Sequence, residues 1–196
     1  QTEERPSTPD VVEASPVRCP DPLISAQIEA YLTQLVEEGD TTGGIIACEV
    51  RGLPAGLGEP IYDKLHARLA YAMLSINAAK AFEIGEGFRG AGMQGSVHND
   101  PFIQEGGEIR PQTNHAGGVL GGISTGAPLF FRVGFKPIAT LRKPQLTVNA
   151  AGEMVTLAAG GRHDPCPVPR AVPIVEAMAA LVLADFYLLW RAGRPL

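Results

Sequence analysis

Three ionisable side chains stand in consecutive positions directly before a proline-rich corner. Arg162, His163 and Asp164 precede the run Pro165-Cys166-Pro167, and an apolar helix is expected from Ile174 to near Arg191. A guanidinium group is a planar set of donors that fits a carboxylate or a phosphate. Asp164 could pair with Arg162, orient it, or cap the helix that follows. The alternative to a binding site is an ion-paired, capped helix entry.

A lysine at the end of an expected strand is the second candidate. In FKPIATLRKP, residues 135–144, Lys136 is followed by a proline that fixes the next turn, and Thr140 adds a hydroxyl group. A lysine beside free backbone amides is a chemically sensible phosphate site. Arg142 and Lys143 could belong to that site or form a solvated basic face.

The glycine-rich stretch NHAGGVLGGISTG is the third candidate. Its five glycines allow a backbone to pass close to a ligand, although close strand packing would also explain them. The stretch has neither a Gly-Lys-Ser/Thr sequence nor a GxGxxG pattern that opens a helix. His98, His115 and His163 could equally be satisfied structural histidines. The four histidines of the chain show no metal-ligand spacing, so we expect no metal site.

Charge is unevenly spread along the 196 residues, whose net charge is −5. Residues 1–60 carry eleven acids and three bases, whereas residues 106–170 carry seven bases and three acids. A local basic segment in an acidic protein favours a small anion as ligand over nucleic acid. Three cysteines without CxxC spacing favour a reducing compartment.

The start of the chain shows no signal-peptide pattern, and its first residue is Gln1. We therefore do not expect this position to be a translation start. No apolar run was expected to approach the roughly 20 residues that a membrane span needs. The sequence therefore predicts no membrane association.

The first half of the sequence alternates helical and strand patterns. Residues 1–22 contain five prolines and are expected to be an extended loop, a linker or a disordered segment, ahead of part of a folded domain over 23–196. The further expected elements are a helix from Pro22 that Gly39 ends, a strand over Ile45–Val50, a helix from Asp63 to near Ala79, and a short strand in AFEIGEGF.

The second half is less regular. Residues 87–118 show weak periodicity, and GVLGGISTG and PLFFRVGFKP are expected to be strands paired across the turn at Gly126-Ala127-Pro128. A short hairpin is expected around Gly152. The closing helix, with Pro173 in its first turn, is apolar nearly all round and is expected in a large core or an oligomer interface. The mixture favours an α+β fold.

Five of these stretches, taken together, resemble one family. GLPAGLGEPIYDKL, LSINAAKAFEIGEGF, QTNHAGGVLGGISTG, FKPIATL and GRHDPCPVPRAVPIVEAM resemble, in this order, the C-terminal half of chorismate synthase, over approximately residues 19–190. The resemblance implies an α+β sandwich with helices packed between antiparallel sheets. It also implies elimination of phosphate from 5-enolpyruvylshikimate 3-phosphate to give chorismate, a requirement for reduced FMN, and a cytoplasmic homotetramer. It implies no nucleic-acid or membrane partner.

The resemblance assigns roles to individual residues. Asn77 and Ala78 match a pair that approaches FMN, and Gly121 matches a glycine against the cofactor. Arg162 matches an arginine beside flavin and substrate, and Asp164 matches an aspartate proposed to handle a proton near the flavin. The segment on the phosphate side of FMN comprises Lys136, Pro137, Ile138, Ala139 and Thr140.

The motifs of the family's N-terminal half have no match in this sequence. In the family they carry two histidines implicated as acids and several arginines that grip the substrate. We therefore expect the chain alone to be an inactive half of the enzyme. The alternatives are a non-catalytic module that binds flavin weakly or not at all, and a generic phosphate-binding α+β domain. The sequence leaves open whether reduced flavin comes from a separate reductase or from an intrinsic NADPH-dependent activity.

Overall fold

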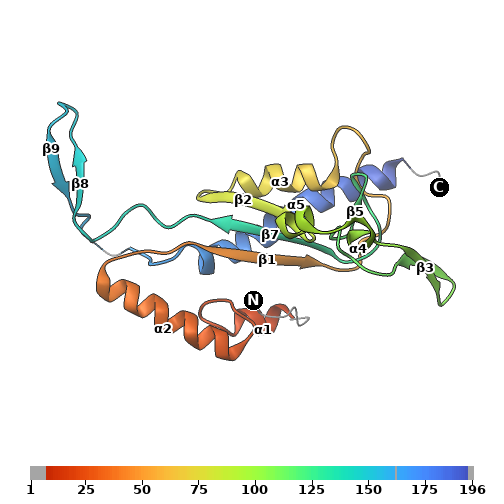
Figure 1. Cartoon of the computed structure of the whole chain (residues 1–196), viewed down its shortest axis with the longest axis horizontal. Coiled ribbons are helices and arrows are strands. Elements are labelled where there is room, and N and C mark those ends of the chain that lie inside the picture. The colour runs from red at the N-terminus through yellow and green to blue at the C-terminus, as the bar shows by residue number, and fades with distance from the viewer. Residues whose placement is uncertain (1–7, 162, 194–196) are drawn as a thin grey trace. The chain divides into compact units, whose positions relative to one another are not determined.

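A computed structural model describes residues 8–161 and 163–193. The chain divides into two compact units. The first unit combines the described residues of Gln1–Gly44 with those of Phe135–Val172, and the second combines Ile45–Gly134 with the described residues of Pro173–Leu196. Helices and several antiparallel strand pairs are mixed along the chain, which confirms the predicted α+β class (Figure 1).

Helix α2 (Pro22–Glu38) is the main helix of the first unit. The Asp21 side chain accepts hydrogen bonds from the amides of Leu23 and Ile24, and Gly39 ends the helix in a left-handed conformation with φ 71°. An aspartate cap, a proline in the first turn and a terminal glycine are the expected boundary signals. The predicted limits of this helix are confirmed.

Residues 8–21, the described part of the segment before α2, are more ordered than the sequence suggested. The structure forms a short helix, α1 (Pro9–Glu13), where a loop was expected. Proline suits the first turn of a helix because its missing N–H would have no partner there. Arg18 pairs with Glu13 at 2.9 Å and also donates to the carbonyl oxygen of Pro169. These contacts tie the proline-rich segment to the rest of the first unit.

The carbonyl oxygen of Pro169 explains why α5 (Val168–Ala192) begins before the predicted Ile174. Pro173 lies inside this helix, and its missing N–H would otherwise have bonded to the carbonyl of Pro169. Because Arg18 donates to that carbonyl instead, the helix can run through the proline. The helix start was predicted too late because this partner is distant in sequence.

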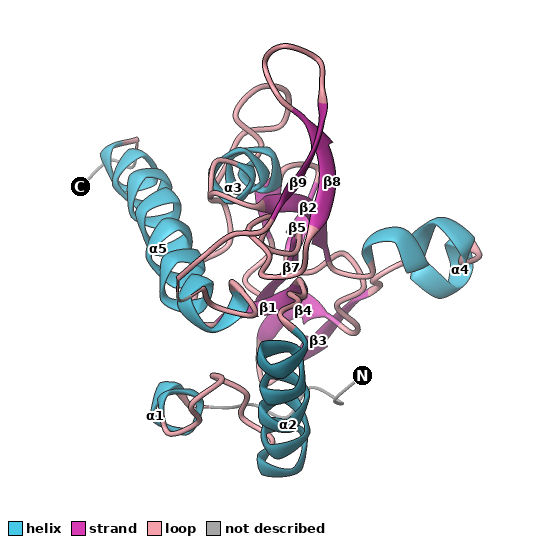
Figure 2. Cartoon of the chain, turned by 90° about the vertical axis from the view of Figure 1, so that its left-hand side faces the viewer, coloured by secondary structure: helices cyan, strands magenta, loops and turns pink. Residues whose placement is uncertain are grey.

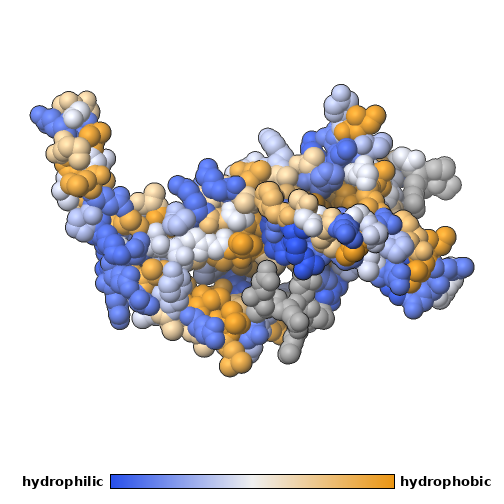
Figure 3. All heavy atoms as spheres, in the orientation of Figure 1, coloured by the Kyte–Doolittle hydropathy of each residue, from blue (hydrophilic) through white to orange (hydrophobic). Residues whose placement is uncertain are grey.

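The hairpin of the first unit lies around Gly152, as predicted. Strands β8 (Gln145–Val148) and β9 (Met154–Leu157) pair in antiparallel register, with Val148 opposite Met154. Every residue of both strands is exposed, and Figure 3 shows several apolar side chains along the hairpin.

The second unit is organised around a three-stranded sheet with the order β1-β7-β2. These strands are β1 (Gly44–Val50), β7 (Leu129–Phe135) and β2 (Ala79–Ile84). Helix α3 (Leu65–Leu74) contacts β2, and Figure 2 shows α3 and α5 on the same side of the strands. The remaining elements are η1 (Gly87–Gly92), α4 (Gly95–His98) and two hairpins, β3 (Phe102–Glu105) with β4 (Glu108–Pro111) and β5 (Val119–Leu120) with β6 (Ile123–Ser124).

Strand β7 supplies the centre of the core. Its side chains alternate between buried and partly exposed, as expected for a sheet covered on one face. Phe131 is fully buried and its ring lies 5.5 Å from that of Phe82 on β2. The other buried residues of this core include Leu65, Leu69 and Met73 of α3 and Val175, Ala179, Leu183 and Phe186 of α5.

Two predictions for this unit are wrong. Strands β5 and β6 pair with each other across Gly121-Gly122, whereas β7 pairs with β1 and β2. The expected turn at Gly126-Ala127-Pro128 therefore does not close a hairpin between the two apolar runs. Helix α3 is also shorter than predicted at both ends, because Asp63 has φ 57°, which a right-handed helix excludes, and turns follow Leu74.

Helix α5 combines a buried face with an exposed apolar face. By length and composition alone it could cross a membrane, which corrects the expectation that no apolar run is long enough. A core helix of a soluble protein passes the same test. Ile174, Leu181 and Leu188 are exposed at intervals of seven residues. This repeat places an apolar stripe on one side of the helix.

The two faces of α5 predict different costs for the same substitution. Leu183→Ala removes a buried side chain and should lower the free energy of unfolding by about 2–5 kcal/mol. Leu181→Ala alters a side chain that is 67% exposed and should cost less than about 0.5 kcal/mol. Urea unfolding followed by circular dichroism measures both. Equal losses that grow with protein concentration would show that the outer face is covered by another copy.

Candidate functional site

Asn77 and Ala78 form a tight turn between α3 and β2. The amide of Ala79 donates to the carbonyl of Ile76 at 3.1 Å, which closes the turn. Ala78 has φ 68°, a left-handed conformation that costs a residue with a side chain about 1–2 kcal/mol. Such strain is often found where backbone geometry serves function. The feature therefore agrees with a role for this pair but does not define its ligand.

Gly121 occupies the tip of the β5–β6 hairpin. Gly121 and Gly122 have φ of 62° and 101°, which is the pattern of a two-residue hairpin turn that favours glycine. A Cβ on Gly122 would lie 2.5 Å from the carbonyl oxygen of Glu59, so packing excludes a side chain there. A Cβ on Gly121 would meet nothing within 4 Å. Gly121 therefore leaves open space in front of its backbone.

The structure does not bring Gly121 beside Asn77 and Ala78. The carbonyl of Gly122 accepts from the amide of Leu65 at the start of α3, at 2.8 Å, whereas Asn77 follows the end of that helix. Ten helical residues span about 15 Å, so the two candidate contacts lie at opposite ends of α3. A ligand that touches both must be long, or must be bound between copies.

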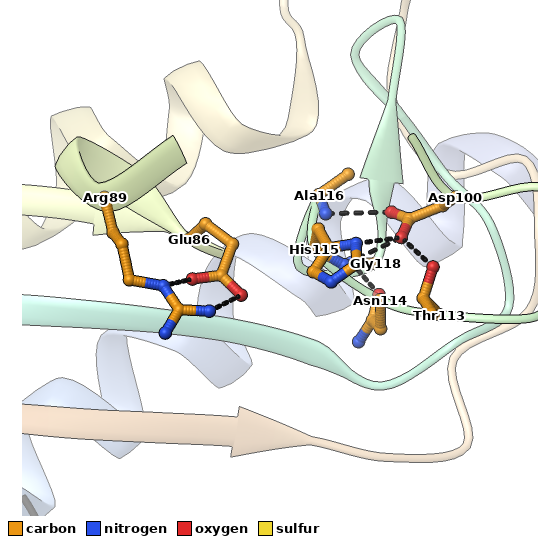
Figure 4. A network of polar contacts seen from close by, with 8 residues as sticks. All are labelled: Glu86, Arg89, Asp100, Thr113, Asn114, His115, Ala116 and Gly118. Carbon is orange, nitrogen blue, oxygen red and sulfur yellow. Dashed lines mark hydrogen bonds and ion pairs between the residues drawn. The ribbon is translucent and has the colours of Figure 1, made fainter. Parts of the chain in front are cut away.

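A buried carboxylate anchors the loop that leads to the glycine hairpin (Figure 4). The side chain of Asp100 is 3% exposed and accepts three hydrogen bonds. Their donors are the Thr113 hydroxyl at 2.7 Å and the amides of His115 and Ala116 at 2.8 and 2.9 Å. Sequence reasoning missed Asp100. Its donors lie thirteen to sixteen residues away, in a segment without periodicity.

The glycine turn has a second clamp. The side-chain oxygen of Asn114 accepts from the amide of Gly118 at 2.7 Å, and its amide group donates to the carbonyl of Pro128 at 2.8 Å. His115 places Nδ1 3.2 Å from Asp100, and its ring centroid lies 5.9 Å from that of His98, with the two rings tilted by 34°. The conformation of residues 113–118 is therefore set by side chains, and His115 belongs to the support of the loop.

Burial alone would raise the pKa of Asp100. The hydrogen bonds from Ala116, Thr113 and His115 outweigh that effect and hold the pKa below its ordinary value. A carboxyl group with a lowered pKa in the folded state stabilises the fold at pH values above its unfolded pKa. That stability is lost as the pH falls through the lowered value.

The segment Lys136–Thr140 follows β7 in the first unit. The Thr41 hydroxyl donates to the carbonyl of Ile138 at 2.7 Å, which fixes the middle of the segment. Within the described chain, the amides of residues 138–140 donate to no other protein group. The exposed Lys136 stands beside them. A cation with unbonded amides is the arrangement that a phosphate group requires.

Arg142 and Lys143 have structural partners. Their amides donate to the carbonyl of Gly39, and the Lys143 ammonium lies 2.6 Å from a carboxylate oxygen of Asp40. The Arg142 guanidinium also donates to the carbonyl of Val36. Both residues therefore attach the segment to the end of α2, which leaves Lys136 as its phosphate-binding candidate.

The proline-rich corner lies against the same part of the first unit. Arg162 is outside the described residues. The carbonyl of Pro165 accepts from the amide of Thr42 at 2.8 Å, so the corner is held beside the residues that precede β1. Asp164 forms an ion pair of 3.1 Å with Arg170, a partner that the sequence analysis did not name. His163 lies with Nε2 3.0 Å from the carbonyl of Gly160.

A cavity of about 460 Å³ joins the two candidate segments. It is lined by Ile138 of the lysine segment and by His163, Asp164 and Arg170 of the corner. The structure thus brings together two stretches that are more than twenty residues apart in the sequence. Among the described residues no group of three or more His, Cys, Asp or Glu side chains could hold a metal ion. The described lining holds one cationic side chain, that of Arg170, and one carboxylate, that of Asp164.

The Asp100 network predicts a pH-dependent stability. Asp100→Asn places an NH2 group against backbone amides and should lower the free energy of unfolding by about 1–3 kcal/mol at pH 7. The difference should shrink as the pH falls through the lowered pKa of Asp100, because the parent then loses its carboxylate. Urea unfolding at pH 7 and pH 3 measures this. The exposed Asp63→Asn is the control, and equal pH profiles for parent and Asp100→Asn would contradict the assignment.

The sequence comparisons with known proteins all match the same family. The family model "Chorismate synthase" matches residues 5–188, which extends the resemblance to the proline-rich start. The chorismate synthase of Bacteroides fragilis is 56% identical over 182 residues, which is 93% of this chain and 51% of the relative. That of Porphyromonas gingivalis is 55% identical over 188 residues, covering 95% of this chain and 51% of the relative.

A solved structure agrees with the sequence comparison. A crystal structure of chorismate synthase matches with a TM-score of 0.76 at 33% identity, over 94% of this chain and 48% of that chain. The chain therefore spans about half the length of the relatives it matches. The order of its motifs, its α+β fold and these matches together show that the chain belongs to the chorismate synthase family.

Proposed function

We propose that the chain is the flavin-phosphate half of a chorismate synthase. In this proposal the complete enzyme eliminates phosphate from 5-enolpyruvylshikimate 3-phosphate and requires reduced FMN. The observation that carries the proposal is the cavity that Ile138 of the segment Lys136–Thr140 lines together with His163, Asp164 and Arg170 of the corner. The unbonded amides of residues 138–140 fit the phosphate group of FMN.

Binding and positioning are the tasks of this half. Lys136 and the amides of residues 138–140 hold the phosphate end of the cofactor, and the carbonyl of Ile138 is fixed by Thr41. When bound, reduced FMN would supply electron density to the allylic system of the substrate. The role proposed for the Asp164 carboxylate is to accept and return a proton through Oδ1, because its other oxygen, Oδ2, contacts Arg170.

The substrate site requires more than this chain. By resemblance, the histidine acids and most arginines that hold the substrate belong to the other half of the family's chain. Loss of phosphate develops negative charge, and preorganised cations lower that barrier. We infer that the complete protein is a cytoplasmic homo-oligomer, a tetramer by resemblance. The second candidate is a non-catalytic module that folds and oligomerises. The exposed apolar face of α5 favours it, because another copy of the chain could cover that face.

Activity should depend on the other half. The chain alone, supplied with chemically reduced FMN and substrate without oxygen, should form no chorismate above the protein-free background. The chain combined with the N-terminal half of the Bacteroides fragilis relative should form it. Chorismate formed by the chain alone would contradict the half-site proposal. A folded complex that binds flavin but forms no chorismate would favour the non-catalytic module.

Lys136→Ala tests the phosphate end of the cofactor site. A charge-assisted contact contributes about 1.5–3 kcal/mol, so the dissociation constant for FMN should rise roughly tenfold to a hundredfold in that complex. The constant for substrate should change much less. Lys143→Ala is the matched control, because its ammonium group pairs with Asp40. An unchanged FMN constant in Lys136→Ala would refute the assignment.

Asp164→Asn separates a proton-handling role from a structural one. The amide keeps the shape of the side chain but cannot accept and release a proton. Turnover of the complex should fall at least about a hundredfold while FMN still binds and the melting temperature barely moves. Near-normal turnover would leave Asp164 as a structural partner of Arg170.

A further inference from the structure

Arg170 stands where helix electrostatics disfavour a cation. It is the third residue of α5, a helix of 25 residues without an acidic residue in its first turn. The N-terminal end of a helix carries a partial positive charge, so an arginine there is unfavourable unless an anion lies nearby. In the structure that anion is Asp164, whose carboxylate lies 3.1 Å from the Nε of Arg170.

Stability does not explain this ion pair. The side chain of Arg170 is 80% exposed and that of Asp164 is 35% exposed. Ion pairs between exposed side chains contribute little to folding, because water solvates both charges. A cation in an unfavourable position that adds little stability is better explained by a ligand.

The cavity supplies the place for that ligand. Arg170 and Asp164 both line it, with Ile138 of the lysine segment on another part of its wall. With Nε engaged by Asp164, the guanidinium group retains its two terminal NH2 groups. These form a planar fork that matches two oxygens of a phosphate.

We propose that Arg170 is an anion-binding residue that exchanges its contact with Asp164 for the oxygens of a phosphate monoester in this cavity. The proposal rests on the proposed function, whose cofactor and substrate both carry such a group. The exchange also releases the Asp164 carboxylate from its cation when the ligand binds. Arg170 thus joins Lys136 as a source of positive charge, from a different segment of the chain.

The exchange predicts opposite effects for the two partners. Inorganic phosphate is titrated into the 196-residue chain, and the amide shifts of His163 and Asp164 are followed by NMR. Arg170→Gln should raise the dissociation constant roughly tenfold. Asp164→Asn should lower it several-fold, because Arg170 then has no competing carboxylate. A purely structural pair would weaken binding in both variants or in neither.

The pair Arg89 and Glu86 offers matched controls. Arg89 is 73% exposed and holds Glu86 at 2.5 Å, in the second unit (Figure 4). Arg89→Gln and Glu86→Gln change the net charge by the same amounts and should leave the phosphate constant within twofold. If they shift it as far as the site variants do, the effect is general electrostatics and the proposal is overturned.

Titration with FMN and with 5-enolpyruvylshikimate 3-phosphate distinguishes the two sources of the phosphate group. The ligand whose binding weakens in Arg170→Gln, while the other is unchanged, is the one that Arg170 contacts. Absence of saturable phosphate binding by the parent chain at millimolar concentrations would overturn the proposal, as would an unchanged constant in Arg170→Gln. Formation of chorismate by the complex is measured separately, so failure of the proposed function is recognised independently.

Discussion

The packing of β7 is the constraint on which the other features of the second unit depend. Leu129, Phe131 and Val133 are fully buried at alternate positions of a strand that lies between β1 and β2. The burial of three large side chains on one face fixes the register of the strand, because a slip of one residue would expose all three. The glycine-rich stretch enters this strand and the segment Lys136–Thr140 leaves it. Both candidate segments are therefore continuous with a strand whose inward side chains are fully buried.

Side chains and prolines hold the irregular segments where sheet and helix hydrogen bonds are missing. Asp100 fixes the loop before the glycine hairpin by accepting from two amides and one hydroxyl group. Arg18 supplies the donor that Pro173 cannot, so α5 begins at Val168, ahead of the predicted Ile174, and includes Arg170. In each case a polar side chain satisfies backbone groups that would otherwise be left without partners.

The sequence predicted what local signals determine. The limits of α2 were predicted correctly from the cap at Asp21 and the glycine after the helix, and the β8–β9 hairpin from the turn at Gly152. Each of these signals acts on neighbouring residues. It did not predict that β7 pairs with β1 and β2, nor that Asp100 is buried, since both depend on contacts between distant segments. The resemblance named Lys136, Asp164 and Gly121, but only the structure shows that the first two segments share a cavity and that Gly121 lies far from Asn77. The roles of these residues toward FMN stay predictions.

Native-state hydrogen exchange tests the role of β7 most directly. If β7 holds the second unit together, the amides of Phe131 and Val133 exchange only when the unit unfolds, and their protection free energy equals its free energy of unfolding. The amides of the exposed β8–β9 hairpin, such as Thr147, should exchange by local opening and far faster. Exchange of Phe131 and Val133 at the rate of the hairpin amides would contradict the claim that this strand supports the glycine-rich stretch before it and the segment Lys136–Thr140 after it.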